Sequence, residues 1–152
     1  MDILRLSRRC HMGTSEQVIA DLREPTRVLR RAAPGAWAGF ATLHDEAMKD
    51  GALDAKVKEL MALVAAVVKH CDGCIAYHAK AAARQGATSE EVAEALSVAL
   101  LMDGGPSTTY GPRAFAAFRE FSDAQPSPEP RQPPQDSGIP VANGHEVAVA
   151  TS

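Results

Sequence analysis

Apolar residues recur through residues 15–122 at intervals of three and four, which is the spacing of one face of an α-helix. The clearest case follows Asp54, a good N-cap, with apolar residues at positions 57, 60, 61, 64, 67 and 68. This stretch is apolar nearly all round after Glu59, so we expect its helix to be central. No segment alternates between apolar and polar positions as a half-buried strand would. The pattern therefore predicts an all-α fold of roughly six helices.

Prolines divide the first half of this pattern. A helical pattern begins near Ser15, and we expect it to break at Pro25, because proline suits the first turn of a new helix, and again at Pro34-Gly35. Residues 36–48 predict a further helix that closes at Asp50-Gly51. We expect Trp37 on its apolar face, like the phenylalanines at 115, 118 and 121, to belong either to the core or to a contact between subunits. That face carries Trp37, Phe40, Leu43 and Ala47.

Glycines and a capping box divide the second half. The chain turns over residues 70–73, and the alanine-rich residues 74–85 predict a helix that Gly86 closes. Thr88 and Glu91 have the spacing of a capping box for the next helix, whose inward positions are 92, 96, 99 and 100. A Gly-Gly-Pro sequence at 104–106 stops that helix. A last helix follows Pro112 and carries a phenylalanine at positions 115, 118 and 121.

Length and composition limit the folded part of the chain. Its 152 residues correspond to about one domain. Residues 1–14 form an N-terminal segment that lacks periodicity, and residues 123–152 are rich in Pro, Ser, Gly and Gln. We expect both ends to be disordered, with Met12 as an alternative start, and a single helical domain over residues 15–122.

Charge and hydropathy argue against two classes of partner. The net charge of -3 provides no basic surface for nucleic acid, and we expect the arginines at 27, 30 and 31 to form a solvated helix face. No stretch reaches the roughly 18 apolar residues of a membrane span. The first twelve residues contain three arginines and no apolar run, so they are a poor secretory signal. We expect a cytoplasmic protein without nucleic-acid or membrane partners.

The three cysteines point to thiol chemistry. Their odd number does not suit a secreted disulfide framework. Cys10 stands alone near the start, whereas Cys71 and Cys74 form a CxxC motif that His78 follows. On a helix these three positions share one face. In a reducing compartment such a pair more often takes part in catalysis or binds metal than forms a structural disulfide. We therefore expect a redox-active pair.

The neighbouring side chains suit proton transfer. The reacting species in thiol chemistry is the thiolate, which the amides and dipole at a helix start favour. His78 can accept or relay the proton, and Glu59 on the preceding helix can orient that imidazole or act as a base through water. Glu59 has an alternative partner in Lys56. His70 either tunes the adjacent Cys71 or faces solvent.

Two other functions use the same residues. A thiol–disulfide oxidoreductase would pass electrons to a partner protein instead of reducing peroxide. A zinc-stabilised helical binding module would take its ligands from Glu59, Cys71, Cys74 and His78. The chain has neither a second CxxC nor an HxxxH sequence, so we expect no metal and no other cofactor.

Glu59 and the sequence from Cys71 to His78 resemble the core of the alkylhydroperoxidase D-like branch of the carboxymuconolactone decarboxylase superfamily. The resemblance extends over about residues 15–122. It implies an all-helical subunit that assembles into homotrimers or homohexamers. It also implies a thiol-dependent peroxidase whose substrate is a hydroperoxide and whose reductant is a dithiol or lipoyl-type protein.

The resemblance also assigns roles to single residues. Cys74 would be the attacking thiol, Cys71 the resolving thiol, and Glu59 with His78 the proton relay. One position departs from the pattern: Gly73 stands where better-studied members often have histidine or an aromatic residue. The decarboxylase branch lacks the cysteine pair, so lactone decarboxylation is not expected.

Overall fold

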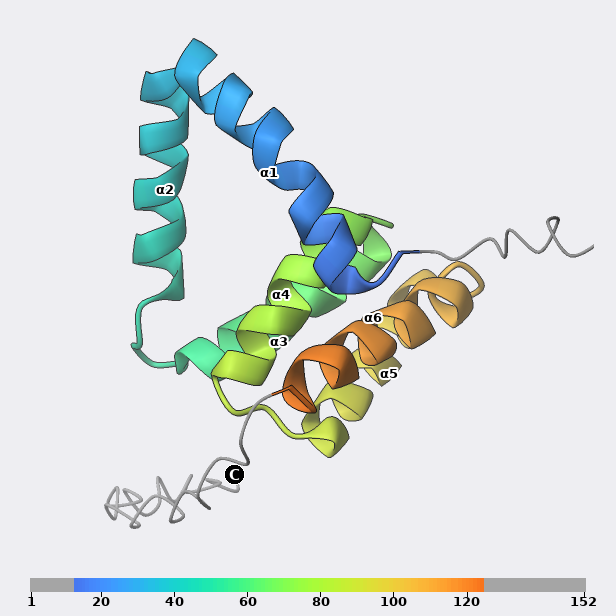
Figure 1. Ribbon diagram of the computed structural model, residues 1–152. Helices are drawn as coiled ribbons and strands as arrows, with labels where there is room; N and C mark the ends of the chain where they lie inside the picture. The colour runs from blue at the N-terminus through green and yellow to red at the C-terminus, as the bar shows by residue number, and fades with distance from the viewer. Residues whose placement is uncertain (1–12, 125–152) are drawn as a thin grey trace, which may run out of the picture.

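The computed structural model describes residues 13–124, and every regular element within that range is an α-helix (Figure 1). The helices are α1 (Ser15–Ala32), α2 (Pro34–Met48), α3 (Ala55–Val68), α4 (Asp72–Arg84), α5 (Ser89–Asp103) and α6 (Ser107–Ser122). The predicted all-α class is confirmed. The disorder predicted for the two ends concerns mainly residues 1–12 and 125–152, which lie outside the described residues. None of the six described helices has the length and apolar character needed to cross a membrane.

Helices α3 to α6 pack against one another and enclose the core (Figure 1). Helix α3 contacts the other three, as its apolar surface predicts. Leu63 on α3 is completely buried, and Phe118 on α6 is 1% exposed. Leu100 was expected to face inward but is 43% exposed, because α5 lies at the edge of this unit and buries only a narrow stripe. Burying each large side chain contributes about 1.5–3 kcal/mol to folding.

Most helix ends follow local signals in the sequence. The Asp54 carboxylate accepts the N–H of Val57 at 2.8 Å, as the predicted N-cap of α3. Thr88 and Glu91 form both hydrogen bonds of the capping box that opens α5. Gly86, after α4, has a φ of 73°, which glycine adopts without the steric cost of a Cβ.

Two prolines lie inside helices, contrary to prediction. Helix α1 continues through Pro25, and α6 begins at Ser107, so that Pro112 falls within it. A proline inside a helix leaves the carbonyl four residues earlier without its N–H partner. Here both prolines and the residues four positions earlier, Asp21 and Thr108, are exposed. Water can therefore solvate these carbonyls, and the helices continue.

Helices α1 and α2 project from the four-helix unit, and we refer to them as the arm (Figure 1). Helix α1 lies across α4 and buries only Ile19, whereas α2 has no buried residue. Phe40 and Leu43 on α2 are 59% and 65% exposed. The apolar face of α2 is therefore not part of this chain's own core. The alternative prediction, a contact between subunits, stays a prediction.

Candidate active site

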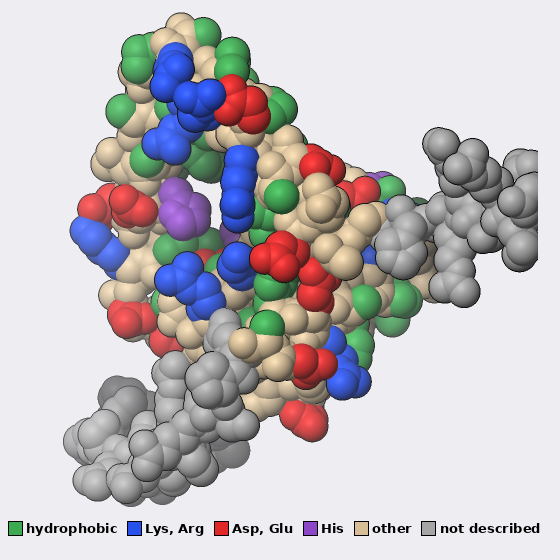
Figure 2. Space-filling view, in the orientation of Figure 1, with side chains coloured by type: hydrophobic (Ala, Val, Ile, Leu, Met, Phe, Trp, Pro, Cys, Tyr) green, Lys and Arg blue, Asp and Glu red, His purple; other side chains and the backbone are tan. Residues whose placement is uncertain are grey.

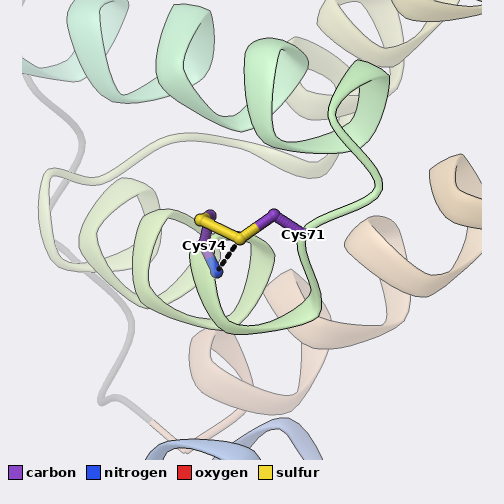
Figure 3. Close-up of a disulfide and its surroundings, with 2 residues drawn as sticks. All are labelled: Cys71 and Cys74. Carbon is purple, nitrogen blue, oxygen red and sulfur yellow. Dashed lines mark hydrogen bonds between the residues drawn. A yellow bond between two sulfur atoms is a disulfide. The ribbon is translucent and has the colours of Figure 1, made fainter. Parts of the chain in front are cut away.

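Cys71 and Cys74 lie at the N-terminus of α4 and are joined by a disulfide (Figure 3). The helix begins at Asp72, two residues before the predicted start, because Cys71 is its N-cap. The Cys71 Sγ accepts the backbone N–H of Cys74 at 3.3 Å, so it pairs with an amide that has no partner within the helix. Cys71 is half-buried and Cys74 is exposed. Cys74 is therefore the more exposed residue of the pair.

A tight turn at the end of α3 sets the position of Cys71. The His70 N–H bonds to the Val67 carbonyl at 2.9 Å, and the Cys71 N–H bonds to the Ala66 carbonyl at 3.1 Å. These two bonds form a Schellman motif, whose left-handed position usually holds glycine. Here that position holds His70, with a φ of 53°, at a backbone cost of roughly 1–2 kcal/mol.

The His70 side chain ties this turn to α5 and α6. Its Nε2 lies 3.3 Å from Oδ2 of Asp103, and its ring stacks on Tyr110 with centroids 4.6 Å apart. The Ser107 hydroxyl donates to the same Asp103 oxygen at 2.8 Å. The Ser107 hydrogen bond, with a further contribution from His70, lowers the pKa of Asp103. The ring is partly exposed, yet it is anchored by contacts with two helices, which neither alternative from the sequence foresaw.

Glu59 on α3 and His78 on α4 form a hydrogen-bonded pair. Glu59 on α3 is 6% exposed, and its Oε2 lies 2.8 Å from His78 Nδ1. Because a carboxylate can only accept, we assign the proton to Nδ1, which leaves Nε2 as the acceptor of the imidazole. His78 follows Cys74 by one helical turn on α4. The buried carboxylate therefore orients an imidazole on the helix that carries both sulfurs.

Lys56, the alternative partner of Glu59, forms its ion pair with Glu91 instead. Partial burial raises the pKa of Glu91, but hydrogen bonds from Lys56 and from the Thr88 amide outweigh it, so the net shift is downward. This pair connects the start of α3 to the start of α5. The Glu59 carboxylate is consequently available to His78.

Two further contacts next to the cysteine pair were not foreseen from the sequence. A Cβ placed at Gly73 would lie 3.0 Å from Cδ1 of Leu22, so α1 passes directly over this residue. Arg113 on α6 lies 3.5 Å from the carboxylate of Asp72 and 5.0 Å from the Tyr110 ring. The first contact means that a side chain at position 73 would require the flexible end of Leu22 to move. No local pattern reveals either contact, since each joins distant parts of the chain.

The structure thus brings the four predicted site residues together as two pairs. Cys71 and Cys74 form the disulfide, and Glu59 and His78 form the hydrogen bond. Cys10 lies outside the described residues. Within residues 13–124, no three His, Cys, Asp or Glu side chains are grouped as they would be around a metal ion.

Fold and site together define a class: an all-helical subunit with a cysteine pair at a helix start and a histidine on the same helix that is hydrogen-bonded to a buried glutamate. The family model of the carboxymuconolactone decarboxylase family matches residues 34–121. This chain therefore belongs to the carboxymuconolactone decarboxylase family. Its cysteine pair, Glu59 and His78 are consistent with the alkylhydroperoxidase D-like branch.

Solved structures share this fold. A carboxymuconolactone decarboxylase family protein from Legionella pneumophila is 42% identical, with a TM-score of 0.69, over 71% of this chain and 96% of that one. A family member from Thermotoga maritima, for which an involvement in the antioxidative response has been suggested, is 34% identical. That match has a TM-score of 0.62 and covers 70% of this chain and 91% of the other. An uncharacterised protein from Cupriavidus necator is 38% identical over 100 residues, which are 66% of this chain and 88% of that protein.

Proposed function

We propose that this chain is a cytoplasmic, thiol-dependent hydroperoxide reductase. The observation that carries the proposal is the hydrogen bond between buried Glu59 and half-buried His78, which lies one helical turn from the exposed Cys74. An oriented imidazole beside an accessible thiol is what peroxide reduction requires, because the thiol must lose a proton and the leaving oxygen must gain one. Membership of the family and the antioxidative role suggested for the Thermotoga relative support the same activity.

The first step consumes the oxidant. The Cys74 thiolate attacks the terminal oxygen of the hydroperoxide, and the O–O bond breaks. Cys74 is oxidised to a sulfenic acid, and the peroxide is reduced to an alcohol. The alkoxide leaves with a proton from the relay, in which Glu59 holds the His78 imidazole so that Nε2 can carry protons between Cys74 and the substrate.

The second step produces the disulfide in which the two cysteines are found. The Cys71 thiol attacks the sulfur of the sulfenic acid at Cys74, an S–S bond forms, and water leaves. An external dithiol, which is either a small molecule or a lipoyl-type protein, then reduces the disulfide by thiol–disulfide exchange and is itself oxidised. Both thiols are regenerated, and the cycle transfers two electrons from the dithiol to the peroxide.

Stopped-flow measurement of peroxide consumption tests this cycle. We expect the Cys74→Ser variant to lose the fast phase entirely. We expect Cys71→Ser to complete a single turnover and to retain a sulfenic acid at Cys74, which mass spectrometry after brief peroxide treatment would detect. Equal rates for the wild type and Cys74→Ser would refute the proposed function.

One observation favours a second function, thiol–disulfide exchange with a partner protein. The Cys71 Sγ accepts an amide N–H at the start of α4, an arrangement that stabilises a thiolate at Cys71 rather than at Cys74. A protein disulfide would then be attacked by Cys71. Comparing turnover of a hydroperoxide with turnover of a disulfide substrate separates the two: the proposed reductase favours the peroxide, and its Cys74→Ser variant is inactive.

We also propose that the chain assembles into homotrimers or homohexamers. The support is the apolar surface that a single chain leaves uncovered on α2 and α5, where Leu43 and Leu101 are 65% and 82% exposed. Light scattering after size-exclusion chromatography is expected to give three or six copies. A monomer at micromolar concentration would contradict this assembly.

A further inference from the structure

A hollow of about 610 Å³ lies between the arm and α4, and arginines line it. Figure 2 shows basic side chains gathered over the part of the arm where α1 approaches α2, above an opening in the surface. The residues that matter for the argument are Arg23, Arg27, Arg30 and Arg31 from α1 and Tyr77 from α4. The volume falls within the roughly 300–1,000 Å³ that is usual for small-molecule sites.

The arginines carry more positive charge than their neighbours neutralise. Residues 23–33 contain four arginines and one acid, Glu24, a local charge of +3 in a chain whose net charge is -3. Glu24 binds Arg27 through two hydrogen bonds, and Arg30 lies 5.8 Å from the centre of the Trp37 ring. The side chains of Arg23 and Arg31 form no ion pair or hydrogen bond with any other described residue.

The arginines at 27, 30 and 31 are exposed, as predicted for a solvated helix face. The side chains do reach solvent, but they do so around a hollow whose opposite wall includes Tyr77. The methylene stems of arginine and the ring of Tyr77 offer apolar contact, while the guanidinium groups offer forked donors that match a carboxylate. The lining therefore suits a ligand with an apolar body and an anionic end.

The hollow also adjoins the cysteine pair. Tyr77 follows Cys74 by three residues on α4, so the two side chains lie about one turn apart, with Cβ atoms roughly 5–6 Å from each other. On the other wall, Leu22 contacts Gly73, and Arg23 is the next residue in the chain. Neither cysteine lines the hollow, but its Tyr77 wall lies one turn along α4 from Cys74, which is an exposed residue.

We propose that this hollow binds the carboxylate of an organic substrate with an apolar body. Resting on the proposed function, the substrate class is a carboxylate-bearing organic hydroperoxide, whose acid group the arginines hold while its peroxide group reaches Cys74. A neutral hydroperoxide of the same size lacks the ionic contact and binds more weakly.

Binding can be tested by fluorescence, without any redox chemistry, because the only tryptophan in the sequence, Trp37, lies against Arg30. The fluorescence of the oxidised full chain is titrated with octanoate and, separately, with octanamide at equal ionic strength. We expect a saturable change with octanoate only. We expect Arg23→Gln/Arg31→Gln to weaken octanoate binding about tenfold or more, the usual effect of losing charge-assisted bonds. The control is Arg119→Gln on α6, which should bind as the wild type does.

Equal responses to octanoate and octanamide would overturn the proposal, and so would unchanged octanoate affinity in the double variant. Circular dichroism confirms that the variants are folded.

A second measurement compares reduction of a fatty-acid hydroperoxide with that of its methyl ester. The double variant is expected to raise KM for the acid about tenfold and to leave the ester unchanged. If octanoate binds as described but neither hydroperoxide is reduced, the anion site stands and the proposed function fails. If both are reduced equally and the double variant changes neither, the reductase stands and the anion site fails.

Discussion

The four-helix unit α3–α6 and the arm α1–α2 are built from the same kind of helices but bury very different amounts of surface. All the buried apolar residues among residues 13–124 belong to α3–α6, apart from Ile19 on α1. On α2, by contrast, Phe40 is 59% exposed despite its size. Apolar periodicity is therefore mostly satisfied within the chain on α3–α6, where the end of α5 with Leu101 is an exception, and is left open on α2. The open face is where we expect a further subunit to pack.

This difference also separates the two parts of the candidate site. The residues proposed for the chemistry belong to the unit that folds around its own core, and Glu59 and His78 join α3 to α4. The arginines proposed for substrate binding belong to the arm. Catalytic groups need a fixed geometry, which dense packing provides, whereas a binding surface of long side chains tolerates a less constrained helix.

The largest effect is expected from a cavity in the core. Phe118→Ala removes a side chain that is 1% exposed, and we expect the free energy of unfolding to fall by about 3–5 kcal/mol. The matched change in the arm, Phe40→Ala, should cost less than about 1 kcal/mol in urea denaturation of the monomer and should instead weaken assembly. Similar losses from both variants in the monomer would remove the distinction between the two regions.

The next effect is on the rate of peroxide reduction. Glu59→Gln keeps the size of the side chain but removes the charge that orients and supports the His78 imidazole, so we expect a rate about a hundredfold lower. The control is Glu94→Gln on the exposed surface of α5, which should react like the wild type. A loss confined to carboxylated substrates would assign Glu59 to binding and contradict its role in the relay.

A smaller effect tests the turn before Cys71. His70→Ala and His70→Gly both remove the ring, but only glycine relieves the left-handed backbone. We expect His70→Gly to be more stable than His70→Ala by about 1 kcal/mol in urea denaturation. Inside a helix, glycine should be less stable than alanine. We therefore expect Ala93→Gly on α5 to lower the free energy of unfolding by about 1 kcal/mol. If alanine were the more stable residue at position 70, the left-handed turn would be contradicted.

The smallest expected effect is on the stability of the fold at acidic pH. The pKa of Asp103 is lowered in the folded state, so its contribution to stability is complete above the unfolded pKa of about 3.9 and is lost as the pH falls toward the folded value. Below about pH 4 we therefore expect the wild type to lose more of its unfolding free energy than Asp103→Asn does. Asp45→Asn on α2 serves as the control in the arm. Parallel stability curves for the wild type and Asp103→Asn would contradict this linkage.

Local signals predicted the helices well where the signal is a cap, whereas the prolines gave mixed results: the break at Pro34 is confirmed, because α2 begins there. Asp54, Thr88 and Gly86 act through atoms within a few residues, so their effects follow from the sequence. The predicted break at Pro25 was wrong, because the outcome depends on whether the unpaired carbonyl reaches water. That exposure is a property of the packed molecule.

The candidate site shows the same division. The spacing of Cys71, Cys74 and His78 along one helix follows from 3.6 residues per turn, so the chain alone predicts that they lie near one another. The partner of Glu59 was open, since the sequence allowed it to pair either with His78 or with Lys56. The packing of α3 against α4 brings Glu59 to the imidazole, and the packing of α3 against α5 takes Lys56 to Glu91.

Periodicity and capping were thus sufficient to derive an all-helical chain with a cysteine pair and a histidine at one helix start. The crossing of α1 over Gly73, the anchoring of His70 on Asp103 and the arginine-lined hollow required the folded chain. Short-range patterns encode the conformation of a segment and the face it presents. Contacts between distant segments depend on how those faces fill space together, and no single segment contains that information.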